Sequence, residues 1–356
     1  MEEIRSLREH GLRIGELEPG PSNTIADLGE VRVGHVTVVR DEPDPPAGRG
    51  VARSGVTAIV PRDPARLCAE PVVAGTAVLN GAGEMTGSLE IGEWGAFETP
   101  VYLTATMSVG RIYDGAVAAA VAADPGVGVD NVVIPVVGEC DDSWLNDART
   151  VQVEADDAAR AVANARAEIA QGAVGAGTGM ICFDYKGGVG TASRIASESG
   201  ALVAVLVLAN FGSQPELRVD GVPVGRLLGA DSAPAGPPRP AGSCIAVVAT
   251  DAPLNSQQLS RLARRAGLGL ARTGSVAHHG SGEIFLGFST SARSPATEYG
   301  EDIDPLFAAT VDATEEAVLN ALWNAPTTEG REGRVVEALP HDDVLELLSA
   351  HHRLER

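Results

Sequence analysis

The dipeptide Gly242-Ser243 stands where a proline-rich loop meets a run of strand-forming residues, PRPAGSCIAVVAT. A serine hydroxyl is a weak nucleophile until a base accepts its proton. If the chain cut itself before Ser243, the freed α-amine, with a pKa of about 7.7, would be available as that base near neutral pH. Gly242 would let the backbone bend so that the hydroxyl can attack the preceding carbonyl. Gly-Ser is also common in linkers, so the dipeptide alone leaves both interpretations open.

A second candidate for chemistry is the segment KGGVGT at residues 186–191. A phosphate-binding loop needs a lysine directly before its Ser or Thr and a helix after it. Here Gly190 precedes Thr191, Lys186 lies five residues earlier, and the following ASRIASESG is a poor helix former. The segment favours a tight structural turn, and a P-loop-like nucleotide-binding protein is the alternative from another functional class.

Potential metal ligands are sparse in the sequence. His278 and His279 with Glu283 lack the H-E-x-x-H spacing that places two imidazoles on one helical face, so a turn leading into a strand is the favoured interpretation. The cysteines lie far apart and form no C-x-x-C pair, which argues against a zinc site and a disulfide framework: Cys68, Cys140, Cys182 and Cys244. We expect no metal and no cofactor, and reduced thiols in a cytoplasmic protein.

Composition excludes several classes of partner. The 356 residues can bury a large core, and the 48 acidic against 27 basic side chains give a formal net charge of −21. Such a charge repels polyanions, so nucleic acid is not an expected partner. No apolar run reaches the roughly 18 residues that a membrane span needs, and the charged N-terminus lacks the apolar core of a signal peptide.

The apolar pattern predicts strands interspersed with helices. Short β-branched segments bounded by turn-forming residues predict strands at 31–38, 56–60, 72–79, 100–106, 132–137, 202–208, 245–250 and 283–290. Helical periodicity predicts helices at 158–172, after the Asn255 cap with Gln258, at 305–324 and at 342–354. The strands do not alternate regularly with helices, which favours sheets packed between helical layers over a doubly wound fold. The proline-rich segment 231–242 divides the chain, and we found no internal repeat.

Long blocks of the sequence resemble one family. They are NGAGEMTG at 80–87, PVVGE at 135–139 with LND at 145–147, KGGVGTASR at 186–194, LANFG at 208–212 with DGVPVG at 220–225, GSCI at 242–245, and HHGSGEIFLGFST at 278–290. In this order they resemble the self-processing N-terminal serine hydrolases that comprise the L-aminopeptidase/D-esterases and β-peptidyl aminopeptidases. The resemblance spans roughly residues 20–325.

The resemblance implies a four-layer α/β/β/α fold, like that of N-terminal-nucleophile hydrolases but with different connectivity. It implies one hydrolase domain over residues 1–356, cut into an α chain of 1–242 and a β chain of 243–356. Family members assemble as tetramers of such αβ pairs, need no metal, and release N-terminal residues from peptides, amides or esters.

The family's functional residues carry over by position. Ser243 matches the nucleophile and Asn210 the side-chain donor of the oxyanion hole. Ser281 and Glu283 match the pair hydrogen-bonded around the nucleophile, and their spacing puts them on one face of a strand. Glu139 matches the carboxylate that meets the ammonium group of the substrate.

The resemblance leaves substrate alternatives open. After Glu139 the chain has Cys140-Asp141-Asp142, without the tyrosine of the D-esterase branch, which argues against D-amino-acid esters and amides. An amidase for ω-amino-acid oligomers is the alternative among hydrolases. Those relatives use threonine and aspartates at the positions of Ser243, Ser281 and Glu283, which favours the aminopeptidase.

Overall fold

A computed structural model describes residues 6–196, 200–229, 242–291 and 303–355, so most of the predicted linker at 231–242 lies outside the described residues. One sheet has four strands in the order β1 (Arg32–Arg40), β2 (Ala52–Val60), β5 (Val101–Ala105) and β6 (Val136–Cys140). β1, β2 and β5 are antiparallel neighbours, whereas β6 runs parallel to β5.

The second sheet has six strands in the order β4 (Ala96–Phe97), β3 (Val72–Gly81), β12 (Gly282–Ser289), β11 (Ser243–Thr250), β10 (Leu202–Asn210) and β9 (Gly188–Ile195). The central strands β11 and β12 are parallel, and the other neighbours are antiparallel. Two small hairpins join β7 (Ile181–Cys182) to β8 (Tyr185–Lys186) and β13 (Thr328–Glu329) to β14 (Val335–Val336).

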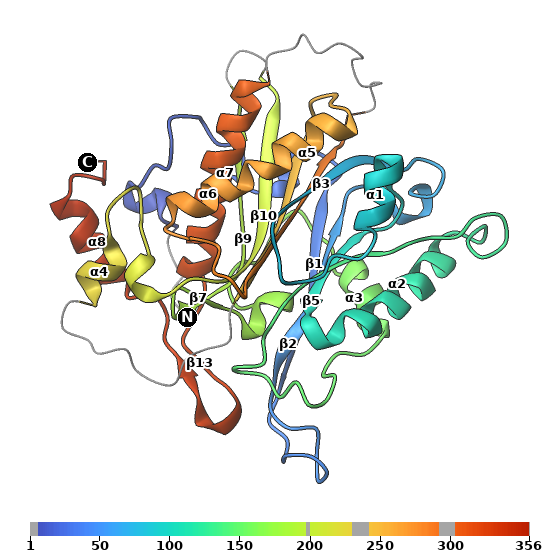
Figure 1. Cartoon of the computed structure of the whole chain (residues 1–356), viewed down its shortest axis with the longest axis horizontal. Helices are drawn as coiled ribbons and strands as arrows, with labels where there is room; N and C mark the ends of the chain where they lie inside the picture. Colours follow the sequence, from blue (N-terminus) through green and yellow to red (C-terminus); the bar gives the residue numbers. More distant parts are fainter. Residues whose placement is uncertain (1–5, 197–199, 230–241, 292–302, 356) are drawn as a thin grey trace.

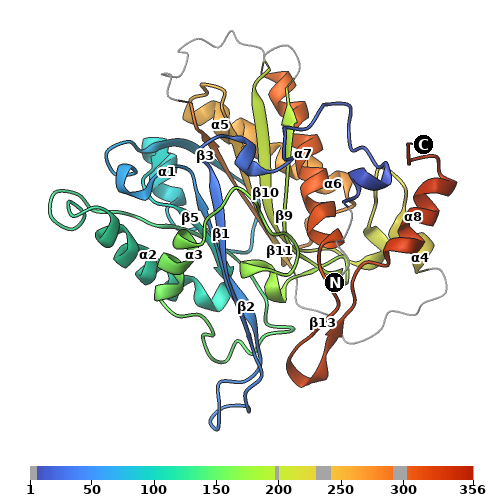
Figure 2. The same ribbon diagram turned by 180° about the vertical axis from the view of Figure 1, so that it is seen from behind.

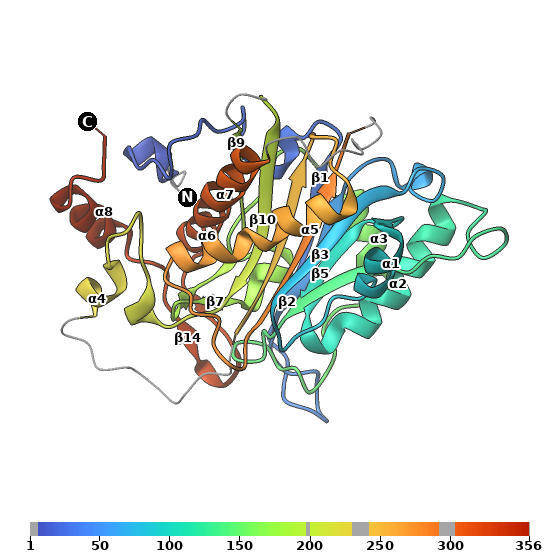
Figure 3. The same cartoon turned by 45° about the horizontal axis from the view of Figure 1, so that its top comes forward.

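Helices cover the outer face of each sheet. The six-stranded sheet carries α5 (Ser256–Arg264), α6 (Ala266–Arg272) and α7 (Asp304–Trp323), which lie together over its strands in Figure 3. The four-stranded sheet carries α2 (Val109–Ala123) and α3 (Asp156–Ala163) on the opposite side of the molecule (Figures 1 and 2). Beside these layers lie α1 (Ser88–Trp94), next to β3, and the pair α4 (Val224–Leu228) and α8 (His341–Ala350).

Three apolar clusters separate the layers. Along β11, Ile245 and Val247 face the four-stranded sheet, while Cys244, Ala246 and Val248 face the helices, as the two-residue period of a strand requires. A third cluster joins the four-stranded sheet to α2 and α3. The predicted four-layer α/β/β/α fold is therefore confirmed. No helix within the described segments is long and apolar enough to cross a bilayer.

The segment KGGVGT corrects our prediction of a tight turn, because its last residues begin strand β9. A side chain at Gly188 would place its Cβ 1.9 Å from the carbonyl oxygen of Gly172, and one at Gly190 would meet the carbonyl of Ala317 on α7 at the same distance. The glycines therefore allow a buried strand to lie against neighbouring backbone. The glycine-rich sequence was wrongly predicted to form a turn, because glycine serves both close packing of a strand against neighbouring backbone and tight turns of the chain.

Two other boundaries differ from prediction. The helix predicted at 158–172 ends at Ala163, and Arg166 instead exchanges two backbone hydrogen bonds with Val33 of β1, each 3.0 Å long. The strand predicted at 132–137 begins only at Val136, since Val132 is 81% exposed. In contrast, the Asn255 cap is confirmed, because Asn255 and Gln258 form the reciprocal hydrogen bonds of a capping box.

Candidate active site

Ser243 is the first residue of the central strand β11. It is paired in register with Asn210, the last residue of β10, and its Oγ accepts a hydrogen bond of 3.2 Å from the backbone N–H of Gly282. Alternation along β11 turns its side chain to the same face as Ile245, toward the four-stranded sheet. The nucleophile predicted from sequence is thus held between rigid strands and is only 6% exposed.

Gly242 packs directly on the backbone of β10. A Cβ at this position would lie 1.7 Å from the carbonyl oxygen of Asn210. No other amino acid fits there without displacing the strand, which gives a steric reason for glycine before the serine. The bond between Gly242 and Ser243 is therefore held against the end of the sheet.

Ser281 and Glu283 lie at the start of β12, where Glu283 is the register partner of Cys244. Both side chains are buried, and the Ser281 hydroxyl donates to Oε1 of Glu283. Burial raises the pKa of Glu283, and the hydrogen bond from Ser281 opposes this shift. The two side chains therefore lie next to each other, although Ser281 precedes the strand.

Asn210 has its carboxamide fixed at both ends. Its Oδ1 accepts from the backbone N–H of Ile181 at 2.8 Å, and its Nδ2 donates to the carbonyl of Asp141 at 2.9 Å. An amide nitrogen carries two hydrogens, so one hydrogen remains for a further acceptor. The two contacts also establish which end of the amide is the donor.

The side chain of Lys186 binds the backbone directly before Ile181, the residue that holds the Asn210 amide. The side chain is fully buried, and its Nζ donates to the carbonyls of Gly177, Met180 and Gly187 at 3.0, 2.7 and 2.8 Å. Burial lowers the pKa of Lys186 to about 7. In the charged form these contacts occupy all three donors of the ammonium group, so Lys186 cannot bind a phosphate as a P-loop lysine does.

Glu139 is a buried carboxylate with hydrogen-bond donors around it. Its Oε1 accepts from the backbone N–H of Glu84 at 2.9 Å, and its Oε2 accepts from the hydroxyl of Thr106. Burial raises its pKa, and the nearby charges of Asp141 and Glu84 act in the same direction. Glu139 has no cation paired with it in the described part of the chain, so it can still accept one.

One cavity of about 750 Å³, here called the Ser243 cavity, lies beside the nucleophile. Ser243 and Glu139 both line it, whereas Asn210, Ser281 and Glu283 are not part of its lining. Two arginines that sequence reasoning did not single out, Arg149 and Arg331, also line this cavity. Neither belongs to a recognisable motif, and each reaches the cavity only through the tertiary fold.

The histidine pair has the structural role that we favoured. Nε2 of His278 lies 2.8 Å from Oε1 of Glu216, and the residues after it form the turn into β12. Within the residues that the structure describes, no three His, Cys, Asp or Glu side chains form a group that could hold a metal. All four cysteines are free thiols.

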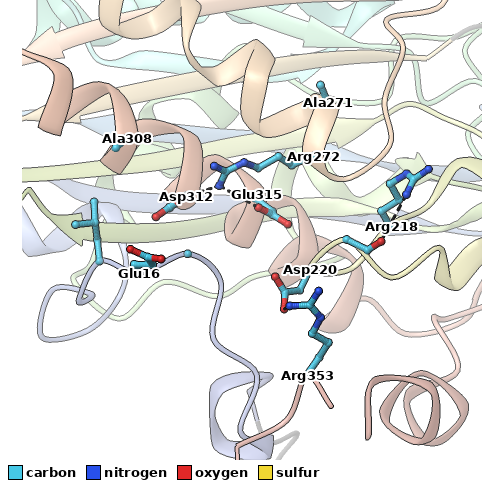
Figure 4. A pocket seen from close by; sticks show the side chains of 12 residues that line it. Glu16, Arg218, Asp220, Ala271, Arg272, Ala308, Asp312, Glu315 and Arg353 are labelled. Carbon is cyan, nitrogen blue, oxygen red and sulfur yellow. Dashed lines mark hydrogen bonds and ion pairs between the residues drawn. The ribbon is translucent and has the colours of Figure 1, made fainter. Parts of the chain in front are cut away.

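A second cavity of about 730 Å³ shares no lining residue with the first, and we call it the Arg272 cavity (Figure 4). Arg272 comes from the end of α6 and pairs with Asp312 on α7 at 2.6 Å and with Glu315 at 3.5 Å. Arg353 lies 3.5 Å from Asp220. Figure 4 shows Arg272 beside Asp312 and Glu315, and Arg353 beside Asp220.

The fold and these contacts define a class of protein, a hydrolase with a four-layer α/β/β/α fold and a serine at the start of a central strand. Peptidase family S58 matches residues 23–336 of the chain. The beta-peptidyl aminopeptidase BapA of Sphingosinicella microcystinivorans is 39% identical over 363 residues, which cover 95% of this chain and 90% of the relative.

Two solved structures are similar over the whole chain. A beta-aminopeptidase of Burkholderia sp. is 40% identical with a TM-score of 0.86, and the match covers 97% of this chain and 99% of that one. The L-aminopeptidase D-Ala-esterase/amidase of Ochrobactrum anthropi, described as a variant of the Ntn hydrolase fold, is 36% identical with a TM-score of 0.88, covering 99% and 100%.

The chain belongs to peptidase family S58. It is a hydrolase with the serine aminopeptidase activity of these relatives. The nucleotide-binding protein and the amidase for ω-amino-acid oligomers are not favoured, the former also because Lys186 is enclosed by carbonyl groups.

Proposed function

We propose that the chain cuts itself between Gly242 and Ser243 and then acts as an N-terminal serine aminopeptidase. The observation that carries this proposal is the position of Ser243. It begins a central strand, follows a glycine packed on the Asn210 carbonyl, and shares a cavity with the unpaired carboxylate of Glu139. A peptide bond at such a site can be attacked by the adjacent hydroxyl.

In the uncut chain Ser243 has no free amine, so another group must accept its proton. We assign this role to Glu283, acting with Ser281. Burial raises the pKa of Glu283, which makes its carboxylate a stronger base than an exposed glutamate. The Oγ attacks the Gly242 carbonyl, the C–N bond breaks to give an ester, and water releases Gly242 as a carboxylate. Processing at the wild-type rate in Glu283→Gln would remove this role.

In the cut enzyme the α-amine of Ser243 becomes the base. The hydroxyl attacks the first carbonyl of the substrate, and the amide of Asn210 with a backbone N–H stabilises the oxyanion. The α-amine passes the proton to the leaving amine, and water then hydrolyses the acyl-enzyme. The free hydrogen on Nδ2 of Asn210 supports its part in this scheme.

Glu139 supplies the preference for a free N-terminus. A buried carboxylate without a paired cation gains a charge-assisted hydrogen bond from an ammonium group, whereas an acylated N-terminus leaves it without a partner. The substrates that we propose are peptides, amides or esters with a free N-terminal α- or β-amino acid. The names of the relatives, which include beta-peptidyl aminopeptidases and an L-aminopeptidase, support both kinds.

The two fragments are expected to stay together as one domain of residues 1–356. Strands β11 and β12 of the 243–356 fragment lie between β10 and β3 of the 1–242 fragment, so one sheet is shared. We propose a cytoplasmic enzyme, in keeping with the four free cysteines, that assembles as a tetramer of αβ pairs. Light scattering after size-exclusion chromatography should give the mass of four pairs.

Denaturing mass spectrometry tests the central proposal. Freshly made protein should give two fragments that meet between residues 242 and 243, and Ser243→Ala should give one intact chain. Acetylation of the freed α-amine should abolish turnover of aminoacyl p-nitroanilides. If wild type and Ser243→Ala both stay whole on prolonged incubation, self-processing is wrong.

A further inference from the structure

The hairpin formed by β13 and β14 is docked beside the Ser243 cavity. The backbone N–H of Arg331 donates to the carbonyl of Leu145 at 2.8 Å, and a Cβ on Gly330 would lie 2.4 Å from the same oxygen. The guanidinium of Arg334 lies 4.3 Å from the ring centre of Trp144. These contacts tie the hairpin to the loop that follows Glu139 and fix where Arg331 stands.

Of the two arginines in the cavity, Arg331 has fewer carboxylate partners than Arg149. Arg149 donates to the buried Asp147 and to Asp44, so its guanidinium is largely occupied. The side chain of Arg331 is 21% exposed and donates from Nη2 to Glu332, whose own side chain is 52% exposed. The Nε of Arg331 is buried without a hydrogen-bond partner among the described residues. A planar guanidinium with free donors is suited to a carboxylate.

The cavity therefore carries opposite charges in separate places. Among the residues that the structure describes, the buried carboxylate of Glu139 has no salt-bridge partner. Arg331 forms a salt bridge with the solvent-exposed Glu332, and its charge also acts on Asp147. Exposed ion pairs are worth little, so a substrate carboxylate can replace Glu332 at small cost. A short peptide is a zwitterion with an ammonium at one end and a carboxylate at the other.

We propose that Arg331 binds the free C-terminal carboxylate of a di- or tripeptide whose ammonium group is held by Glu139. This inference rests on the proposed function and names the substrate class of the same site. The enzyme would then prefer short peptides with a free carboxylate over the corresponding amides.

The test is the ratio of kcat/KM for the free acid to that for the C-terminal amide, measured on di- and trialanine. Their N-terminal residue is α- or β-alanine, whichever the cut wild-type enzyme releases faster from its p-nitroanilide. For at least one peptide length we expect a ratio of about ten, the lower end of what a charge-assisted hydrogen bond contributes, because Arg331 is partly exposed and Glu332 competes for it. The net charge of −21 disfavours anionic substrates, so a ratio above one needs a local cation.

Variants locate the effect. Arg331→Gln should bring the ratio close to one, Arg331→Lys should keep part of it, and Glu332→Gln should raise it because the guanidinium loses its competing partner. Arg353→Gln is the matched control, because it makes the same charge change in the Arg272 cavity. Its ratio should stay within about twofold of wild type.

The outcomes separate the two proposals. Wild-type turnover of the p-nitroanilide with ratios near one at both lengths would overturn the carboxylate site alone. A ratio that falls equally in Arg331→Gln and Arg353→Gln would also overturn it, because the effect would then come from net charge. Absence of p-nitroanilide turnover by the cut enzyme would instead overturn the proposed function.

Discussion

The two cavities have nearly the same volume, about 750 Å³ and 730 Å³, yet their charges are arranged differently. In the Ser243 cavity the buried carboxylate of Glu139 is held by N–H and O–H donors and has no cation in the described structure. In the Arg272 cavity Asp312 and Glu315 share the guanidinium of Arg272. In the second cavity the buried carboxylates thus have a guanidinium beside them, whereas Glu139 stays available.

This contrast shows how a functional site differs from a cavity without a binding function. Volume and charged lining are common to both cavities, so neither feature identifies the functional one. The difference is that Glu139 is prepared to receive a charge that the chain does not supply. Lys186 likewise differs from a ligand-binding lysine, because carbonyl groups of the chain accept its hydrogen bonds.

The largest effect on the Ser243 cavity should come from Asn210→Ala. Loss of an oxyanion donor typically lowers kcat by about 100- to 1,000-fold. The measurement is kcat and KM on an aminoacyl p-nitroanilide, with cutting confirmed first by mass spectrometry. Asn164→Ala, which removes an amide that donates to the His35 carbonyl on the outer layer, is the control and should leave kcat unchanged. A kcat for Asn210→Ala within about threefold of wild type would contradict the role.

Glu139→Gln should lower kcat/KM by about 30- to 100-fold, because the ammonium group loses a charge-assisted hydrogen bond. Glu315→Gln makes the same change in the Arg272 cavity and should leave kcat/KM within about twofold, since the substrate is proposed to bind in the Ser243 cavity. An N-acetylated substrate should be poor for wild type and no worse for Glu139→Gln. Equal losses in the two variants would break the distinction between the cavities.

Much of this organisation could be predicted from sequence. The β-branched segments located seven of the ten strands of the two main sheets and overlapped β6 by two residues, and the Asn255 cap located α5. Resemblance supplied Ser243, Asn210, Ser281, Glu283 and Glu139, and the structure brings these side chains to one end of the sheets. Their roles remain predictions.

Other features could not be predicted because they depend on tertiary packing. Gly188 and Gly190 serve close approach of β9 to neighbouring backbone rather than a turn, and this depends on what lies opposite them. Arg331 reaches the Ser243 cavity only because its hairpin docks on Leu145, far away in sequence. Local patterns report spacing, whereas these roles need the positions of distant segments.

The Arg272 cavity should affect stability rather than catalysis. Burial raises the pKa of Glu315 to about 7 from an ordinary value of 4.5. Because its pKa is higher in the folded state than in the unfolded state, protonated Glu315 stabilises the folded protein. This stabilisation is complete below the unfolded-state pKa and is lost as pH rises through the folded-state pKa. Glu315→Gln removes this loss, so its free energy of unfolding should exceed that of wild type by about 1 to 3 kcal/mol at pH ~8, with a smaller difference at pH ~5.5.

Denaturant titration of the cut proteins at the two pH values makes this measurement. Asp220→Asn serves as a control in the same cavity, since its carboxylate also has a raised pKa but is closer to solvent. A variant less stable than wild type at both pH values would mean that the pairing of Glu315 with Arg272 outweighs the desolvation of its carboxylate.

The smallest effect should come from Arg353→Gln. Its guanidinium is 49% exposed and lies 3.5 Å from Asp220, whose side chain is 29% exposed. Water and salt screen such a pair, so its loss should change the free energy of unfolding by less than about 1 kcal/mol. The difference should shrink further when salt is added, because the Debye length falls to about 3 Å at 1 M. A loss above about 2 kcal/mol that persists in salt would mean that Arg353 holds the C-terminal segment as a buried charge does. The Arg272 cavity would then depend on specific ion contacts, as the Ser243 cavity does.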